Sequence, residues 1–447
     1  MSDGELRCRR DPLNPTHDLR RLLPSKLGVA FALLTCSFGF TAPLSASCAQ
    51  SDPASSSTSS DVDSAIVPPG QLDIDGGVDA ADDCEGDASL ECTTRTLPCE
   101  QAAFCTVAVP ADGHLLTGVW GSGKDNFWAV GTGGVILRWN GTAWSRVASD
   151  TYQSLFAVWG SGEHDVWIAG SRSFVLHGVV EGGTATWQPL PELSAPYYTE
   201  SPVTWTETFA LAAWGTSADD VWIAGEGYPA GPPYPVQWTT VWRSTQADGG
   251  AAWKKALLST QIQTAPAPTI RGLWGADANE VWAVGGHDGP DYSTTHGKSY
   301  RGVPSSDPDG GFELTWTEVD TQSNAILHGV WGSGKDDVWA VGEYGTIRHR
   351  SAGDPRWSVV PSPTDRHLYA IWGSGPNDVW VVGDYGTILH YDGATWTRAT
   401  TTLALGVKPD LRSVWGSAPD DVWVVGKGVA LHFTGPKSPR PATGGQK

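Results

Sequence analysis

The feature that most constrains this chain is a phrase that returns seven times: a Trp-Gly pair whose Trp is followed eight residues later by a second Trp. The pairs are Trp120/Trp128, Trp159/Trp167, Trp214/Trp222, Trp274/Trp282, Trp331/Trp339, Trp372/Trp380 and Trp415/Trp423. The eight-residue gap never varies, while successive phrases begin 39, 55, 60, 57, 41 and 43 residues apart. A fixed phrase at this period indicates an array of repeated β units.

One compact unit shows the internal pattern of the repeat. Residues 368–373 predict a first strand and 378–383 a second, and residues 387–391 and 395–398 predict a third and a fourth, with turn residues between them. Four antiparallel strands in a repeat of about 40 residues form one blade of a β-propeller. The seven phrases therefore predict an all-β, seven-bladed β-propeller of four-stranded blades over residues 102–435.

The sequence also predicts how the ring closes. Trp144, Trp316 and Trp357 each precede the next phrase by 15 residues, in the expected fourth strand, but no such Trp follows the last repeat, which ends at its third strand. Phe104 stands 16 residues before Trp120. We therefore expect residues 103–109 to form the outer strand of the last blade, as a latch that joins the chain ends and removes exposed sheet edges.

The N-terminal region has the pattern of an export signal. A basic stretch precedes an apolar run, residues 27–40, and then small residues that include Cys48. This order predicts an export signal over residues 1–48, with a retained membrane anchor as the alternative. Cys48 is a candidate lipidation site, so we expect the protein in the bacterial cell envelope, at the outer membrane or in the periplasm, or secreted, with membrane contact only through such a lipid.

Residues 49–83 are rich in Ser and Asp and contain no Lys or Arg, which predicts a disordered linker; residues 436–447 predict a disordered tail. A cysteine cluster, residues 84–105, leads into the latch. Its members are Cys84, Cys92, Cys99 and Cys105. In an exported protein they predict two disulfides, with three pairings open. Zinc is the alternative, but no Cys-x-x-Cys pair or interleaved His supports it, so no metal or cofactor is predicted.

The repeat resembles a known group. Val-Trp-Gly-Ser-Gly-x-x-Asp-Val-Trp-x-Val-Gly-x-x-Gly-x-x-Leu-His, nearly whole at residues 330–349 and 371–390, resembles the repeats of bacterial exported β-propeller proteins related to bacterial neuraminidase repeats and photosystem-assembly-factor propellers. Propellers with such repeats include hydrolases, lyases, receptors and assembly factors. The resemblance therefore implies a fold and no single activity.

Several polar residues repeat with the fold, and we expect them to be structural. Two residues before each second Trp lie Asp165, Asp220, Glu280, Asp337, Asp378 and Asp421, with Asn126 in the first repeat; third strands carry His177, His349, His390 and His432. We expect the acids to fix a turn by accepting backbone N–H bonds. The histidines are expected to pack or hydrogen-bond between blades, and the Trp residues to fill the gaps between blades.

Residues that vary within the repeat are better candidates for function. Three positions before each first Trp, where the innermost strand begins beside the channel mouth, the repeats carry Thr117, Phe156, Leu211, Arg271, His328, Tyr369 and Arg412. Because guanidinium groups bind planar anions at two points, Arg271, His328, Tyr369 and Arg412 are candidate ligand-binding residues for a carboxylate or sulfate. The alternative is that they pair with local acids or plug the channel.

Three insertions, residues 192–208, 226–240 and 287–299, should rise on one face of the ring. They or their flanks contain the candidate ligand-binding residues Tyr198, Trp205, Tyr228, Tyr234, Trp238 and Tyr292. Tyr and Trp offer flat amphipathic contact area that suits sugar rings or protein partners, although they can also pack on one another.

The main functional hypothesis is an exported or cell-surface, monomeric binding module for a glycan or a protein, using the aromatic face over blades two to four. The formal charge of -20 argues against nucleic acid as a partner. No Gly-x-Ser-x-Gly or His-Glu-x-x-His motif occurs, which favours a non-enzymatic role. Two alternatives stay open: a polysaccharide hydrolase or lyase with an Arg-lined channel mouth, and a non-enzymatic assembly scaffold.

Overall fold

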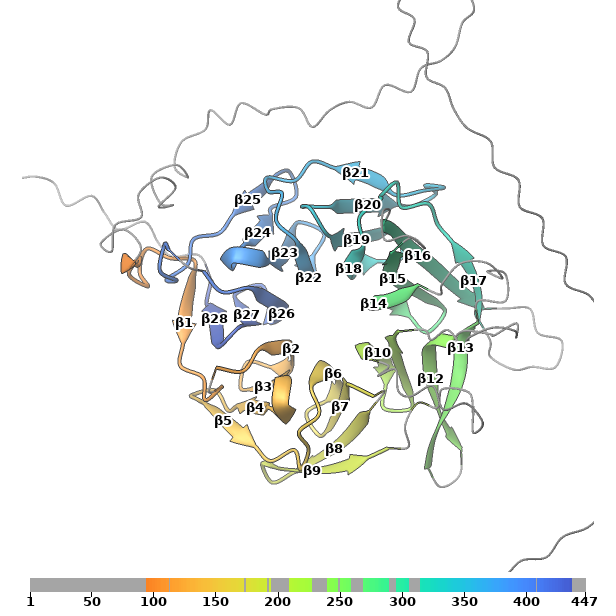
Figure 1. Ribbon diagram of the computed structural model, residues 1–447, viewed down its shortest axis with the longest axis horizontal. Coiled ribbons are helices and arrows are strands. Elements are labelled where there is room, and N and C mark those ends of the chain that lie inside the picture. The colour runs from red at the N-terminus through yellow and green to blue at the C-terminus, as the bar shows by residue number, and fades with distance from the viewer. Residues whose placement is uncertain are drawn as a thin grey trace, which may run out of the picture. The chain divides into compact units, whose positions relative to one another are not determined.

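The computed structural model describes residues 94–111, 113–172, 174–190, 193, 209–226, 239–247, 250–258, 268–288, 295–304, 314–406 and 408–435. Within them, 28 strands form seven separate four-stranded sheets, which stand as blades around one axis (Figure 1). The predicted all-β seven-bladed propeller is confirmed. The predicted export signal, its Cys48, the linker and the C-terminal tail lie outside the described residues.

In six blades the strands follow sequence order from the centre of the ring to its rim. Blades one to three consist of β2 (Leu116–Gly123), β3 (Asn126–Gly131), β4 (Ile136–Trp139) and β5 (Trp144–Val147); β6 (Leu155–Gly162), β7 (Asp165–Gly170), β8 (Val175–Glu181) and β9 (Thr184–Pro189); and β10 (Ala210–Ser217), β11 (Asp220–Gly225), β12 (Thr239–Ala247) and β13 (Gly250–Leu258). Blades four to six consist of β14 (Thr269–Asp277), β15 (Glu280–Asp288), β16 (Thr295–Pro304) and β17 (Leu314–Glu318); β18 (Leu327–Gly334), β19 (Asp337–Gly342), β20 (Ile347–Ser351) and β21 (Ser358–Val360); and β22 (Leu368–Gly375), β23 (Asp378–Gly383), β24 (Ile388–Tyr391) and β25 (Trp396–Arg398). Two 3-10 helices, η2 (Thr132–Gly134) and η3 (Asp384–Gly386), occupy turns.

The seventh blade joins the two ends of the ring. It consists of β26 (Leu411–Ala418), β27 (Asp421–Gly426), β28 (Val429–Phe433) and, as the outer strand, the N-terminal β1 (Phe104–Val107). β1 is antiparallel to β28, with Phe104 opposite Phe433. In Figure 1 the orange β1 lies beside the blue β28. The predicted N-terminal latch is confirmed.

The latch is also attached to blade six. The Phe104 N–H donates to the Thr400 carbonyl oxygen at 3.0 Å, and the Thr402 N–H donates to the Phe104 carbonyl oxygen at 3.0 Å. A disulfide joins Cys99, which precedes β1 by five residues, to Cys105 within the strand. Cys84 and Cys92, the other members of the predicted cysteine cluster, lie outside the described residues.

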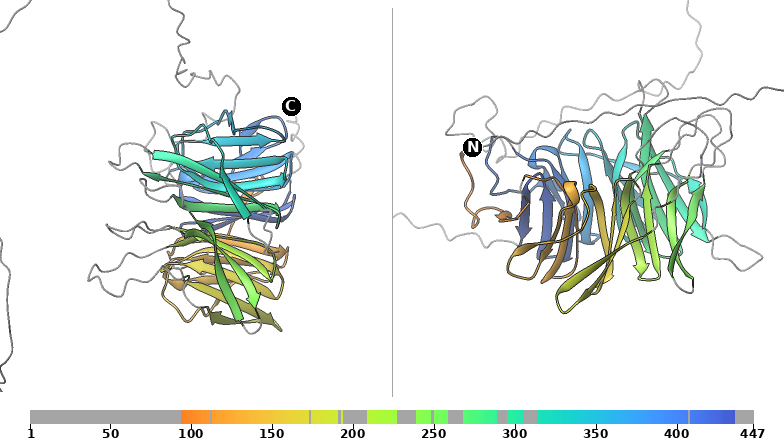
Figure 2. Two further views of the ribbon diagram at one scale, coloured as in Figure 1. Left: turned by 90° about the vertical axis from the view of Figure 1, so that its right-hand side faces the viewer. Right: turned by 60° about the horizontal axis from the view of Figure 1, so that its bottom comes forward.

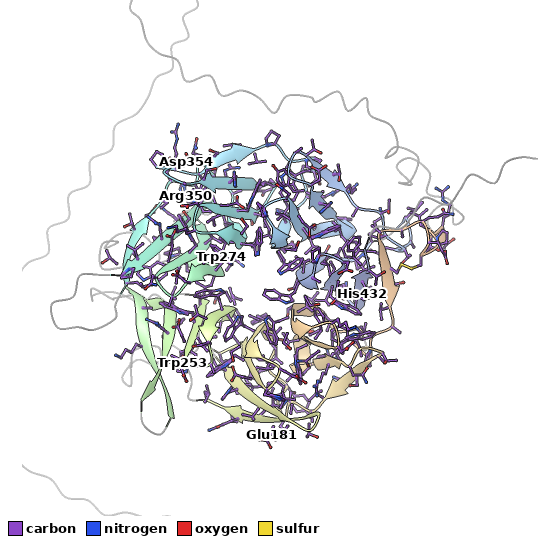
Figure 3. The ribbon with its side chains drawn as sticks, turned by 180° about the vertical axis from the view of Figure 1, so that it is seen from behind. Glu181, Trp253, Trp274, Arg350, Asp354 and His432 are labelled. Atoms are coloured by element: carbon purple, nitrogen blue, oxygen red, sulfur yellow. A yellow bond between two sulfur atoms is a disulfide. The ribbon has the colours of Figure 1, made fainter. Side chains whose placement is uncertain are left out.

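The Trp-Gly pair is explained by contacts between neighbouring blades. A Cβ placed on Gly373 would lie 2.6 Å from the ring of Trp331, and one on Gly332 would lie 2.6 Å from the ring of Trp274. Six of the first Trp residues thus cover the Gly of the next blade, and Figure 3 shows Trp274 at the inner edge of the ring. The circle closes where the Trp415 indole N–H donates to the carbonyl oxygen of Gly121 at 2.9 Å.

The second Trp of each phrase is buried against the fourth strand of the next blade. Ring centroids are 5.3 Å apart for Trp282 and Trp357, and 5.1 Å apart for Trp423 and Trp144. Trp380 meets Phe104 in the same way, at 5.1 Å. Phe104 therefore takes the place of a fourth-strand Trp, and the expectation that Trp residues fill the gaps between blades is confirmed.

The expected hydrogen-bond partners of the repeated acids and histidines were wrong, whereas packing between blades is found for His432, whose ring centroid lies 6.5 Å from that of Trp139 in blade one. In blade two, Asp165 accepts hydrogen bonds from the Ser161 hydroxyl (2.6 Å), the Trp167 indole (3.1 Å) and the His177 Nε2 (2.6 Å). The His177 ring stacks on Trp167 with centroids 4.2 Å apart. The same arrangement holds the acid and His of blades five to seven. These groups are satisfied by side chains of their own blade, because the third-strand His lies directly opposite the second-strand Trp.

Candidate binding site at the channel mouth

The predicted ligand-binding residues of blades four to seven lie on one face of the ring. In an antiparallel blade, the connection into the first strand and the turn between the second and third strands emerge on the same side. Seen from the side, the strands run roughly along the ring axis, so these segments gather on one face (Figure 2), which we call the mouth face. Arg271, His328, Tyr369 and Arg412 lie near the starts of β14, β18, β22 and β26, on that face.

The structure brings these four side chains into one group, which we call the mouth cluster. The rings of His328 and Tyr369 have centroids 5.2 Å apart. The Cζ of Arg412 lies 3.8 Å from the centroid of the Tyr369 ring, in a cation–π contact. The positive charges of Arg271 and Arg412 both act on His328, so the cluster is electrostatically continuous from blade four to blade seven.

Each member of the mouth cluster also has an acidic neighbour. The pairs are Arg412 with Asp410 (Nη2 to Oδ2, 3.2 Å), Tyr369 with Asp384, His328 with Glu343 (Nε2 to Oε1, 4.0 Å) and Arg271 with Glu226. The alternative that these residues pair with local acids is therefore correct in part. Sequence analysis missed the acids, although three of them share a signal: Glu226, Glu343 and Asp384 each follow the Gly that ends a second strand.

Burial sets the protonation of the cluster. Burial, together with the nearby Arg271, His367 and Arg412, lowers the pKa of His328 to about 3, so this imidazole is neutral at neutral pH. Burial and the hydrogen bond to Asp384 raise the pKa of the Tyr369 hydroxyl to about 12. Burial also raises the pKa of the Glu226 carboxyl, and the charge of Arg271 opposes this rise.

Two donors of the mouth cluster lack acceptors. The Nε atoms of Arg271 and Arg412 are buried and have no hydrogen-bond partner among the described residues. A buried N–H without an acceptor is costly, so each such group calls for an explanation. Because both Nε atoms are closed off from solvent, a ligand oxygen would reach these donors only after a shift of the two arginine side chains.

The other half of the mouth is uncharged at the same positions. In blade one the Thr117 hydroxyl donates to the Leu155 carbonyl oxygen at 2.6 Å. In blade two Phe156 packs against Phe209 with ring centroids 5.5 Å apart, and blade three places the half-buried Leu211 there. The mouth is thus polar over blades four to seven and largely apolar over blades two and three.

The predicted aromatic loop residues lie outside the described residues. They are Tyr198, Trp205, Tyr228, Tyr234, Trp238 and Tyr292. The prediction of a loop over residues 287–299 was wrong at both ends, because β15 and β16 continue their ladder until Asp288 lies opposite Thr295. This insertion is in part a longer hairpin.

The described part of the chain contains no group of three or more His, Cys, Asp or Glu side chains that could hold a metal ion. It also contains no helix long and apolar enough to cross a membrane.

No family model matches the chain, and no curated protein matches its sequence. Among solved structures, it is similar to YCF48 bound to a D1 peptide, with a TM-score of 0.51 and 16% identity over 77% of this chain and 100% of that one. It is also similar to YCF48 from Cyanidioschyzon merolae, with a TM-score of 0.53 and 16% identity over 74% of this chain and 99% of that one. The likeness is one of fold. It confirms the relation to photosystem-assembly-factor-type propellers at that level, and membership of a bacterial exported repeat family stays a prediction.

Proposed function

We propose that the protein is a binding module whose mouth cluster holds an extended segment of a protein partner. The observation that carries this proposal is the pair of buried Nε–H donors on Arg271 and Arg412, on either side of the neutral His328 and of Tyr369. Main-chain carbonyl oxygens or an acidic side chain of the partner would accept bonds from these guanidinium groups once the two side chains turn towards the ligand.

The chemistry of the mouth favours a peptide as the ligand. Peptides combine oxygen acceptors with apolar side chains, and the mouth offers donors over blades four to seven and the apolar Phe156 and Leu211 across from them. The YCF48 structure with a similar fold is bound to a D1 peptide, which supports a peptide as the ligand class on this fold. A glycan on the aromatic loop face is the competing ligand, and it is an outcome of the test below.

The test begins with linear peptides of 12 residues selected from a random display library on the unmodified protein. We expect Arg271→Gln and Arg412→Gln each to weaken binding of a selected peptide about tenfold or more, since arginines at the centre of an interface dominate its binding energy. Arg146→Gln is the matched control, because Arg146 is exposed on β5, away from the mouth. Selected peptides that bind all three variants equally well would refute a mouth site.

A second candidate function is polysaccharide hydrolysis or lysis. It is favoured by Glu226, whose pKa is raised by burial although the charge of Arg271 opposes the rise, since a raised carboxyl pKa favours the protonated form that a general acid uses. Turnover of polygalacturonate that disappears in Glu226→Gln would support an enzyme. Unchanged turnover in that variant would remove Glu226 from the reaction.

A further inference from the structure

Two turns on the mouth face hold a tyrosine in a backbone conformation that tyrosine rarely adopts. Tyr344 and Tyr385 both have φ of 54°, in the left-handed region. Both lie between the second and third strands of their blades, in turns that read Gly-acid-Tyr-Gly. The turn of equal length in blade one has Gly133 at this position, with φ of 67°. Glycine adopts this conformation without steric cost, so the fold does not require tyrosine there.

Burial does not offset the backbone strain. The two side chains are 69% and 56% exposed, and they are two of the five large hydrophobic residues that stand exposed in the described part of the chain. Strained residues that make no contribution to the core are characteristic of ligand-contact sites, where the rest of the fold maintains the conformation.

Two neighbouring residues, Arg366 and His367, contact the rings of the two tyrosines. The segment that leads into β22 places the Arg366 Cζ 4.4 Å from the centroid of the Tyr385 ring. It also places the His367 ring 4.9 Å from the ring of Tyr344. The Arg366 side chain is 43% exposed, and its Nε lies 3.9 Å from an oxygen of the exposed Asp365 carboxylate. We call Tyr344, His367, Arg366 and Tyr385 the tyrosine rim.

The tyrosine rim is continuous with the mouth cluster. Glu343, which lies beside His328, directly precedes Tyr344, and Asp384, which binds the Tyr369 hydroxyl, directly precedes Tyr385. The Tyr385 N–H donates to Asp410 at 3.4 Å, and the same carboxylate binds Arg412. A chain that occupies the mouth over blades five to seven can therefore extend over the rim.

We propose that the tyrosine rim is a docking surface for the flank of the peptide segment that the mouth cluster holds; this proposal rests on the proposed function. Tyr and Arg, together with Trp, are enriched among the residues that dominate the binding energy of protein interfaces. Arg366 fits an acidic residue of the partner, and the exposed rings of Tyr344 and Tyr385 fit apolar side chains on either side of it. A glycan fits less well, because the Arg366 guanidinium already covers the Tyr385 ring to which a sugar would stack.

The experiment compares binding and stability in the double variant Tyr344→Gly/Tyr385→Gly, with the 12-residue peptides selected on the unmodified protein as probes. Because glycine relieves the left-handed strain, we expect an equal or higher Tm together with at least about tenfold weaker peptide binding. Arg366→Gln should weaken the same peptides. The matched control is Tyr152→Ala, since Tyr152 is 95% exposed on the connection between blades one and two, on the mouth face, and should leave binding unchanged.

The outcomes separate the two proposals. Peptides that bind the double variant as tightly as the unmodified protein, but bind Arg412→Gln weakly, would refute the rim and leave the mouth site standing. Equal binding by all variants would refute both. A Tm several degrees lower in the double variant would show that the tyrosines support the fold. Oligosaccharides that bind the unmodified protein but not the double variant would show that the rim binds a sugar, and would refute the proposal that it binds a peptide.

Discussion

At the scale of single residues, the glycine of each Trp-Gly pair sets how closely two blades approach. In Gly373→Ala the new Cβ would lie 2.6 Å from the Trp331 ring and 2.7 Å from the Asp378 carbonyl oxygen. We expect a loss of about 1–3 kcal/mol in the free energy of unfolding, as for other overpacked sites. Urea titration followed by Trp fluorescence measures it. Gly375, in the same strand, has nothing within 4 Å of its Cβ position, so Gly375→Ala is the control; an equal loss in both variants would contradict the contact.

His328 gives a second prediction at this scale, a dependence of stability on pH. The folded protein holds the pKa of His328 at about 3, whereas the unfolded chain has the ordinary value of 6.5. As pH falls below 6.5 the unfolded chain takes up a proton that the folded protein does not. Stability should therefore fall by about 1.4 kcal/mol per pH unit, from 6.5 towards 3.

The variant His328→Gln isolates this effect. Urea midpoints at pH 7 and pH 5 should differ less in the variant than in the unmodified protein. The carboxyls of Asp165 and Asp378 do not interfere: burial raises their pKa, but hydrogen bonds from His177, Ser161, His390 and Ser374 outweigh it, so they titrate below 3.8. An equal pH dependence in both proteins would mean that His328 has the same pKa in the folded protein as in the unfolded chain.

At the scale of elements, β1 adds one large buried aromatic side chain to its ladder with β28 and its hydrogen bonds to blade six. Phe104 is completely buried and packs against Trp380 and Phe433. Phe104→Ala should cost about 3–5 kcal/mol, because the cavity opens between two blades that cannot easily collapse. Thermal unfolding measures the loss, with Tyr152→Ala as the control for removal of an exposed aromatic ring. A change in Tm no larger than that of the control would refute the role of the latch strand.

The elements themselves were largely predictable from sequence. The second strand expected at residues 378–383 is observed as Asp378–Gly383, because alternating apolar residues and Gly-rich turns fix a strand locally. The convergence of Arg271, His328, Tyr369 and Arg412 followed from their equivalent positions in the repeat. The partners of the repeated acids, and Glu226, Glu343 and Asp384 beside the mouth, did not follow, because side-chain pairing across strands depends on register. The left-handed backbone conformation of Tyr344 and Tyr385 could not be predicted from their residue type, since tyrosine normally avoids this conformation.

At the scale of the whole molecule, the seventh is the one blade among those that the structure describes that draws strands from both ends of the ring. β1 pairs with β28, so opening the ring there requires breaking a sheet ladder as well as side-chain contacts. Blades seven and one, by contrast, meet through contacts made by side chains. These include the packing of Trp423 on Trp144 and the hydrogen bond from the Trp415 indole to the Gly121 carbonyl oxygen. The place where the two chain ends meet therefore decides which of these contacts must break first when the ring opens.

A circular permutant tests this directly. A flexible linker from Gly435 to Thr94 would join β28 to β1, which already pair with Phe104 opposite Phe433, and would place the new chain ends between β1 and β2. Every blade would then be contiguous, and only the blade seven to blade one contacts would close the ring. We expect the permutant to fold and to keep its peptide binding, but to unfold at least about tenfold faster in guanidinium, because the ladder no longer spans the place where the two chain ends meet. The reference is a chain of natural order that begins at Thr94. Equal unfolding rates would show that the latch stabilises its own blade without holding the ring closed.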